Sequence, residues 1–184
     1  MREALLLIDL SKDFIDMDGA LTCGAAGQEI IPYVQGLVEE FRREGRPILD
    51  IRDDHLKSDY EIRTGLFPPH CLTGTPGREL EDRLAAAVEG YEGYVTWPKK
   101  TYDATYETPL LDYLDREGIT RLHVAGVCTD ICVVSTCLGL YKHRVTKRGD
   151  LEIAVHRQGV ASFNAQAHEM ALNHMEHVLK CEIV

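Results

Sequence analysis

Cys132 lies where a cysteine can act as a nucleophile. It follows the apolar run that ends at Val127 and stands near the predicted start of an apolar helix. Unpaired backbone N–H groups and the helix dipole at such a position favour an anion, so they predict a thiolate with a lowered pKa and a site for an oxyanion. A buried structural cysteine is the alternative interpretation. Cys128 and Cys137 do not combine both features.

A nucleophilic cysteine needs a base, and Asp9 is the candidate because it directly follows the apolar run that begins at Ala4. A nearby lysine would stabilise both a thiolate and a carboxylate, and Lys99 or Lys100 can supply it. Taken singly, an aspartate at a strand end is more often a helix cap or a turn former than a base, and either lysine is typical of a solvated surface.

A second group of side chains could hold a metal ion. The stretch DDH at residues 53–55 and His70 together offer two imidazoles and a carboxylate, a set that suits zinc, iron or manganese and leaves coordination positions open. Chance clustering in a loop is the alternative. Cys128 and Cys132 have no matching Cys or His pair, which argues against a structural zinc site. The histidines at 168, 174 and 177 are interpreted as helix-surface residues.

The elements that must position these residues alternate along the chain. Short apolar runs predict strands at residues 5–10, 47–51, 94–97, 121–127 and 151–155. Between them, apolar residues at helical spacing predict helices at residues 29–44, 78–88, 109–117, 131–141 and 164–179. Near-continuous apolar strands are typical of a parallel sheet covered on both faces. We therefore predict an α/β fold: a three-layer, open, parallel, Rossmann-like sheet with helices on both faces.

This architecture brings the polar residues together, because ligands of open α/β sheets bind outside the carboxyl ends of the strands. The residues that close the predicted strands are Asp9, Asp53 with His55, Lys99 with Lys100, and the segment 128–132. We expect them to meet at one edge. Residues 53–77 form a long connection, which is usually functional in a compact domain. The basic residues within 142–150 are interpreted as a solvated loop.

Composition narrows the function classes. The 184 residues fit one domain, residues 1–184, and the net charge of −10 argues against a nucleic-acid or anionic-membrane partner. The N-terminal apolar run is too short for a signal peptide or a membrane span. The six cysteines are therefore interpreted as reduced thiols and the protein as cytoplasmic, with a small molecule as its partner. A homo-oligomer is compatible with this composition.

Seven segments in order carry a resemblance to a known family. They read LLIDLSKDF at 6–14, GALTCG at 19–24, DDH at 53–55, LFPPHCLTGT at 66–75, KKTYDA at 99–104, AGVCTDICV at 125–133 and GVASF at 159–163. Together they make the chain resemble, nearly end to end, the isochorismatase-like cysteine hydrolases, and within them the nicotinamidase/pyrazinamidase-type enzymes.

The resemblance implies a catalytic triad of Asp9, Lys99 and Cys132, with Lys99 chosen because the family lysine stands three residues before the tyrosine, here Tyr102. It also implies a cis peptide between Val127 and Cys128, which would turn the N–H groups of Cys128 and Cys132 toward the oxyanion. The implied metal ligands are Asp53, His55 and His70, with zinc preferred over iron or manganese. The implied aromatic pocket consists of Phe14, Phe67 and Tyr102.

The implied activity is hydrolysis of a small aromatic amide, with nicotinamide converted to nicotinate and ammonia through a thioester on Cys132. Two alternatives stay open: another amidase or ureidase of the same superfamily, and a catalytically silent binding module on this fold. The chain departs from the family pattern at Arg63, where a glutamate metal ligand is frequent, although Glu61 is near. Thr105 replaces a phenylalanine, and the basic segment 142–150 is unusual.

Overall fold

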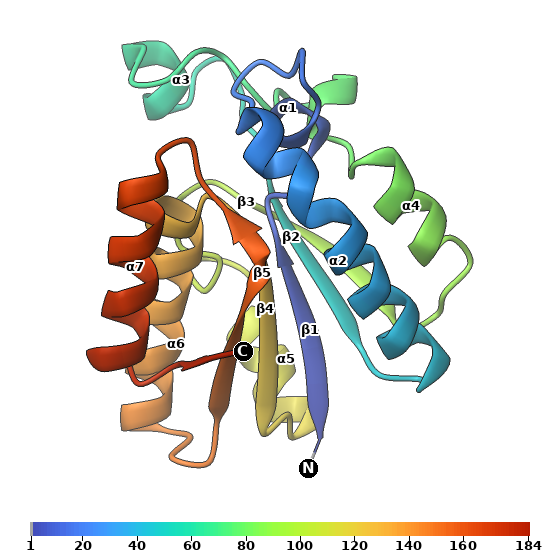
Figure 1. Cartoon of the computed structure of the whole chain (residues 1–184), viewed down its shortest axis with the longest axis vertical. Helices are drawn as coiled ribbons and strands as arrows, with labels where there is room; N and C mark the ends of the chain where they lie inside the picture. Colours follow the sequence, from blue (N-terminus) through green and yellow to red (C-terminus); the bar gives the residue numbers. More distant parts are fainter. Residues whose placement is uncertain (1) are drawn as a thin grey trace.

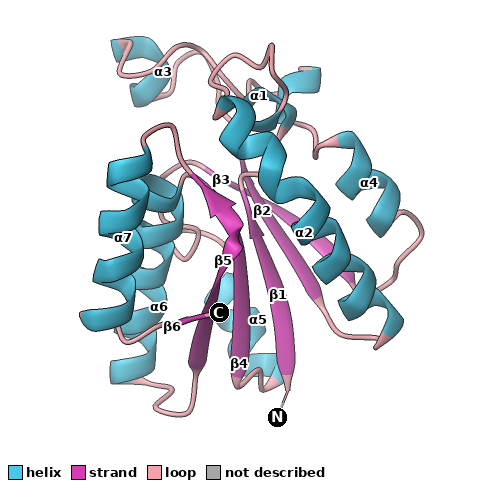
Figure 2. Cartoon of the chain, in the orientation of Figure 1, coloured by secondary structure: helices cyan, strands magenta, loops and turns pink. Residues whose placement is uncertain are grey.

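The computed structural model describes residues 2–184 and contains one six-stranded parallel sheet (Figures 1 and 2). The strand order is β3-β2-β1-β4-β5-β6. The strands are β1 (Glu3–Ile8), β2 (Ile48–Asp53), β3 (Tyr94–Lys99), β4 (Arg121–Val127), β5 (Glu152–Ala161) and β6 (Glu182–Ile183). The chain starts in the centre of the sheet and winds outward in both directions. This doubly wound arrangement confirms the predicted α/β fold with an open parallel sheet.

Helices cover both faces of the sheet (Figure 2). They are α1 (Lys12–Ile15), α2 (Gly24–Arg43), α3 (Tyr60–Thr64), α4 (Asp82–Val88), α5 (Leu110–Glu117), α6 (Val134–Thr146) and α7 (Ala165–His177). One apolar cluster joins α2 and α4 to one face of the sheet, and a second joins α5, α6 and α7 to the other. The central strand β1 contributes to both clusters, with Leu5 and Leu7 in one and Leu6 and Ile8 in the other. Burial on both faces explains why this strand is apolar throughout.

Several predicted boundaries are wrong, for local reasons. Strand β5 continues to Ala161 instead of ending at 155, because its pairing with β4 resumes at Val160, beyond a bulge that follows Val155. The short edge strand β6 was not predicted at all. Residues 142–146, interpreted as loop, form the last turns of α6. The predicted helix 78–88 starts only at Asp82, after a 3₁₀ turn at Pro76–Arg78. Among residues 2–184, no helix is long and apolar enough to cross a membrane.

The carboxyl ends of the central strands meet closely. Asp53 pairs with Lys99 at the ends of β2 and β3, and Ile8 of β1 pairs with Gly126 of β4. Gly126 has a φ of +139°, and a Cβ at this position would lie 2.0 Å from the carbonyl oxygen of Ile8. Only glycine lets β4 approach β1 so closely. The segment that follows β4 is therefore brought beside Asp9.

Candidate active site

Three buried residues from three strand ends form the centre of the site. The Nζ of Lys99 lies 2.7 Å from Oδ2 of Asp9 and 3.6 Å from Sγ of Cys132. Asp9 is oriented by its other oxygen, which accepts a hydrogen bond of 2.8 Å from the backbone N–H of Asp53. Lys99 also pairs with the Asp53 carboxylate. Asp9, Lys99 and Cys132 thus lie together as the sequence predicts, whereas Lys100 is half-exposed and pairs with Asp59 outside this centre.

Burial and charge set the protonation of this group. Burial, together with the neighbouring Asp53 carboxylate, raises the pKa of Asp9 to about 6, although the Lys99 ammonium opposes the shift. Burial alone would lower the pKa of Lys99, but the Asp53 and Asp9 carboxylates outweigh it and raise that pKa well above its usual value. Lys99 is therefore a fixed cation. Asp9 is a carboxylate whose basicity is increased for proton transfer near neutral pH.

The predicted pKa shift of Cys132 is wrong in direction. Burial raises the pKa of this thiol well above its usual value; Asp9 and Asp53 reinforce the shift, and Lys99 opposes it. The sequence argument considered only the helix start, and the structure adds two carboxylates and near-complete burial. The resting group is therefore a thiol. Asp9 must accept its proton before the sulfur can attack.

Cys132 lies in a π-helical turn, Thr129–Val133, that connects β4 to α6. The predicted helix at 131–141 therefore begins as a wider turn, a feature frequent at functional sites. The peptide bond between Val127 and Cys128 is cis. Two contacts tie the turn to the segment after β5: Ser162 donates a hydrogen bond to the Asp130 carboxylate, and Thr129 Oγ1 lies 2.8 Å from Nδ1 of His168. His168 is thus a half-buried partner of this turn and not a free surface residue.

Asp53, His55 and His70 form a second cluster beside the first. One ligand atom from each lies within 4.8 Å of the others, and all three residues are buried. The Nε2 atoms of His55 and His70 lie 3.5 and 3.6 Å from the same oxygen of Asp53. Burial alone would raise the pKa of Asp53, but Lys99 and the two histidines hold it below its usual range. A carboxylate and two imidazole nitrogens therefore face a common point.

Surrounding groups hold these ligands in place. Nδ1 of His70 lies 2.8 Å from the carbonyl oxygen of Pro68; it donates to that oxygen, which leaves Nε2 as a lone-pair donor. The Asp13 carboxylate accepts a hydrogen bond of 2.7 Å from the backbone N–H of Cys71 and so fixes the loop that carries His70. Neither ring nitrogen of His55 has a hydrogen-bond partner of adequate geometry among residues 2–184, despite burial. A buried imidazole that makes no hydrogen bond fits the role of a metal ligand.

Glu61 adds a second carboxylate to this cluster, and Arg63 does not enter it. Oε1 of Glu61 lies 4.0 Å from Nε2 of His70, and burial together with Asp53 raises the pKa of Glu61. The guanidinium of Arg63 lies over the exposed ring of Tyr60, 5.7 Å from its centroid. The helix α3 places residue 61, not residue 63, toward the ligands. The cluster therefore keeps a second carboxylate, from Glu61, although Arg63 stands where the family frequently has a glutamate.

A small cavity opens between the two clusters. Its walls include the predicted Phe14, Phe67 and Tyr102, together with His70, Cys128 and Cys132. Sequence reasoning missed three apolar wall residues, namely Leu21, Ile131 and Phe163. The quoted family segments contain Leu21, Ile131 and Phe163, but no chemical signal distinguishes them from ordinary packing residues. The cavity joins an aromatic wall to the thiol and to the histidine cluster.

All six cysteines are unpaired and buried, as the interpretation of reduced thiols requires. The Sγ atoms of Cys23 and Cys128 lie 3.5 Å apart beside the cavity. Contact with Cys23, reinforced by burial, raises the pKa of Cys128 far above its usual value. Cys128 is therefore no competitor of Cys132 as a nucleophile, because the Lys99 ammonium and the Asp9 carboxylate act on Cys132.

The chain matches a known protein family over nearly its whole length. The isochorismatase domain pattern matches residues 3–182. An uncharacterized isochorismatase family protein of Bacillus subtilis, PncA, is 37% identical over 187 residues, covering 100% of this chain and 99% of the relative. The crystal structure of nicotinamidase PncA from Bacillus subtilis superposes with a TM-score of 0.91 at 35% identity, covering 100% of this chain and 99% of that chain.

A third similar protein was solved with a metal. The crystal structure of the pyrazinamidase of Pyrococcus horikoshii in complex with zinc superposes with a TM-score of 0.85 at 29% identity, covering 100% of this chain and 99% of that chain. The similarity in each case extends over essentially the whole length of both chains.

Proposed function

This chain belongs to the isochorismatase family and is an amide hydrolase, and from that premise we propose that it hydrolyses nicotinamide to nicotinate and ammonia through a thioester on Cys132. The observation that carries the proposal is the buried group formed by Asp9, Lys99 and Cys132, in which one ammonium touches both the carboxylate and the sulfur. A nucleophile, a base and a group that holds both in place are the minimum set for covalent acyl transfer.

The reaction begins with a proton transfer. Asp9 takes the proton of Cys132, and the sulfur attacks the amide carbonyl. Lys99 stabilises the negative charge while it moves between Asp9 and Cys132. The backbone N–H groups of Cys128 and Cys132 receive the oxyanion of the tetrahedral intermediate. The C–N bond then breaks, and Asp9 returns the proton to the leaving ammonia.

The second half of the reaction releases the acid. Asp9 is again a carboxylate after ammonia has left, so it can take a proton from a water molecule that attacks the thioester. The C–S bond breaks, the carboxylic acid leaves, and the sulfur regains its proton. Lys99 keeps its charge throughout, because its pKa is held well above neutrality.

A divalent metal ion, for which zinc is the first candidate and iron or manganese the others, fits the second cluster. Asp53, His55 and His70 would hold it, since they supply one carboxylate and two imidazoles around a common point and neither ring nitrogen of His55 makes a hydrogen bond within residues 2–184. When bound, the ion would ligate the ring nitrogen of a pyridine and so orient the amide toward Cys132. The zinc complex of the pyrazinamidase of Pyrococcus horikoshii supports this assignment.

The shape of the cavity supports an aromatic substrate. Phe14, Phe67 and Tyr102 offer flat apolar walls against which a ring can stack. His70 of the histidine cluster and the thiol of Cys132 both line this cavity. A ring nitrogen and a carboxamide in the arrangement that nicotinamide provides could reach both.

The test is an ammonia-release assay on a panel of amides, with and without a chelator. The panel contains nicotinamide, pyrazinamide, benzamide, which lacks a ring nitrogen, and the ureido compound N-carbamoylsarcosine. We expect nicotinamide to have the highest kcat/KM and to lose its advantage over benzamide after metal removal. Preference for the ureido compound would favour the alternative amidase, and no release from any amide would favour a binding module.

A further inference from the structure

The cavity beside Cys132 is too small for the substrate that the proposed function requires. Only about 20 Å³ of it is wide enough for a water-sized sphere, which is roughly the space that one water molecule needs. A pyridine carboxamide is several times larger than a water molecule. One wall of the cavity must therefore move before such an amide can reach the sulfur. The inference below rests on the proposed function and concerns which wall moves.

Several wall side chains are held by their surroundings. Phe14, His70 and Cys128 are 5%, 2% and 4% exposed, so their movement would disturb the core or the ligand cluster. Asp53 and Cys132 are each 5% exposed as well, and the other wall side chains are half-buried, with one exception. Phe163 is 43% exposed, although its side chain lines the cavity. It is thus the wall residue with the least packing to lose.

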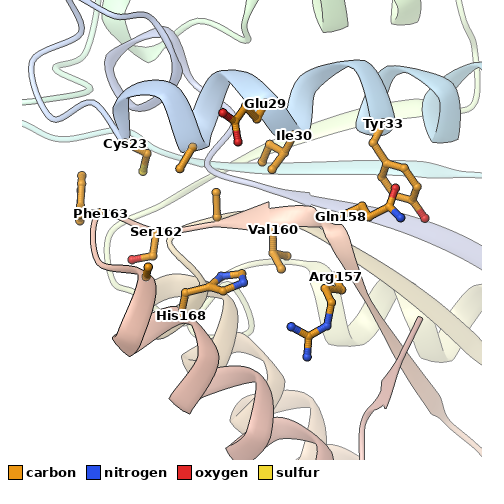
Figure 3. A pocket seen from close by; sticks show the side chains of 13 residues that line it. Cys23, Glu29, Ile30, Tyr33, Arg157, Gln158, Val160, Ser162, Phe163 and His168 are labelled. Carbon is orange, nitrogen blue, oxygen red and sulfur yellow. The ribbon is translucent and has the colours of Figure 1, made fainter.

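Open space lies on the other side of Phe163. A groove of about 510 Å³ runs between α2 and the end of β5, and Phe163 lines this groove as well as the cavity. Figure 3 shows Phe163 at one end of the groove, beside Cys23 and Ser162, with Tyr33 and Arg157 at the other end. The groove therefore provides open space next to the Phe163 ring.

The backbone on both sides of Phe163 is anchored. Ser162 donates a hydrogen bond to Asp130 in the turn that carries Cys132. The side chain of Asn164 accepts hydrogen bonds of 2.9 and 3.0 Å from the backbone N–H groups of Gln166 and Ala167 and so caps α7. The movement is therefore a rotation of the Phe163 side chain about its own bonds, and the main chain stays in place.

We propose that Phe163 is the specificity-determining residue at the entrance of the site, and that its ring swings between the cavity wall and the groove. With the ring against the wall, the cavity is closed around a single-ring aromatic amide. A fused-ring amide cannot be closed in, because its second ring occupies the position to which Phe163 must return. Phe163 thereby selects single-ring amides and excludes larger ones.

The test compares two amides, nicotinamide and the fused-ring quinoline-3-carboxamide, in four proteins. These are the wild type, Phe163→Ala, Phe163→Trp and the control Met170→Ala, which removes another exposed apolar side chain (66%) on α7 outside the cavity. The quantity is the ratio of kcat/KM for the fused-ring amide to kcat/KM for nicotinamide. We expect the ratio to rise about tenfold or more in Phe163→Ala, to fall in Phe163→Trp and to stay unchanged in Met170→Ala.

The outcomes separate the two claims. If Phe163 had a purely structural role, its variants would lower kcat for both amides alike and leave the ratio unchanged. That result would overturn the assignment of Phe163 as the specificity-determining residue, but not the proposed function. An equal rise in Met170→Ala also overturns it, since the effect would then not belong to the cavity wall. If the wild-type protein hydrolyses neither amide, the proposed function and this inference fall together. Thermal melting of each variant shows that the comparison is between folded proteins.

Discussion

The Lys99 ammonium lies 2.7 Å from the Asp9 carboxylate, and both groups are buried at the carboxyl end of the sheet. The same ammonium pairs with Asp53, whose other oxygen faces His55 and His70. One lysine therefore connects the proposed nucleophile centre to the proposed metal centre. Its charge balances two carboxylates that would otherwise repel each other in a medium of low dielectric constant.

Replacing Lys99 with methionine should destabilise the protein strongly. The substitution keeps most of the apolar side chain but leaves Asp9 and Asp53 buried without their cation, at an expected cost of about 3–5 kcal/mol in the free energy of unfolding. Urea unfolding measures this cost. The matched control is Lys100→Met, which removes an exposed pair with Asp59 and should cost less than about 1 kcal/mol. Equal losses in the free energy of unfolding in the two variants would show that the charge of Lys99 does not compensate the buried Asp9 and Asp53 carboxylates.

Metal binding should depend on the histidine cluster. His55→Ala or His70→Ala removes one of three ligands, so zinc retained after dialysis should fall to a small fraction of the wild-type content, measured by elemental analysis. His177→Ala, with a side chain that is 64% exposed on α7, is the control and should retain zinc. Full zinc retention by both cluster variants would contradict the assignment of the ligands.

Glu61 should strengthen this metal site without being essential to it. Glu61→Gln removes the charge that lies beside His70 and should weaken zinc affinity about 10- to 100-fold, the usual effect of losing a supporting group around a metal. Competition with a chromophoric chelator measures the affinity directly. Arg63→Gln is the comparison, because Arg63 points to Tyr60 and its loss should leave the affinity unchanged. A larger loss of zinc affinity in Arg63→Gln than in Glu61→Gln would contradict the conclusion that α3 directs residue 61, and not residue 63, toward the ligands.

His156 should make the protein less stable as the pH falls. It is buried, lies 2.8 Å from both Tyr33 and His123, and has a pKa lowered to about 4 by burial and by the neighbouring His123. The unfolded chain binds a proton below about pH 6.5 and the folded chain does not, so stability is lost between about pH 6.5 and 4. From pH 7.5 to 5 this loss is about 2 kcal/mol.

Urea unfolding of the wild type and of His156→Gln at both pH values measures this contribution. The wild type should lose about 2 kcal/mol more than the variant over this range, because glutamine does not titrate. Glu3 and Arg46 face the far side of His123 and are present in both proteins, so their effects cancel. Parallel stability curves for the two proteins would contradict the prediction.

Gly126→Ala should destabilise the junction of β1 and β4. A methyl group there meets the carbonyl of Ile8 and needs a φ of +139° that L side chains rarely adopt, so a cost of about 2 kcal/mol or more is expected. Gly149→Ala is the control, since a Cβ at Gly149 has no atom within 4 Å. The difference between the melting temperatures of the two variants measures this cost. A Gly126→Ala protein as stable as the control would show that β1 and β4 can move apart without loss of stability.

The layered fold and the polar residues at the strand ends were predictable, because both follow from patterns among residues that are close together in the chain. Apolar strands of the central sheet and polar residues at their ends are visible in the chain itself. The direction of the Cys132 pKa was not predictable, because it depends on Asp9 and Asp53 from distant segments. The role of Phe163 was not visible either, since a single aromatic after a strand has no local signature.

The exact boundaries of strands and helices also depend on contacts between distant segments. The end of β5 was placed too early because the bulge after Val155 interrupts its apolar pattern, although pairing with β4 resumes beyond it. The turn that carries Cys132 is π-helical, and it is in contact with Ser162 and His168. Such contacts join residues that are far apart in the chain, and no pattern of neighbouring residues encodes them.

The most direct test of Cys132 as nucleophile is the rate of ammonia release from nicotinamide by Cys132→Ala relative to the wild type. Cys137→Ala, which removes another buried thiol in the following helix, is the matched control. The account predicts a loss of at least about 10⁴-fold in kcat for Cys132→Ala and an active Cys137→Ala. A Cys132→Ala protein that releases ammonia within tenfold of an active wild type would contradict it.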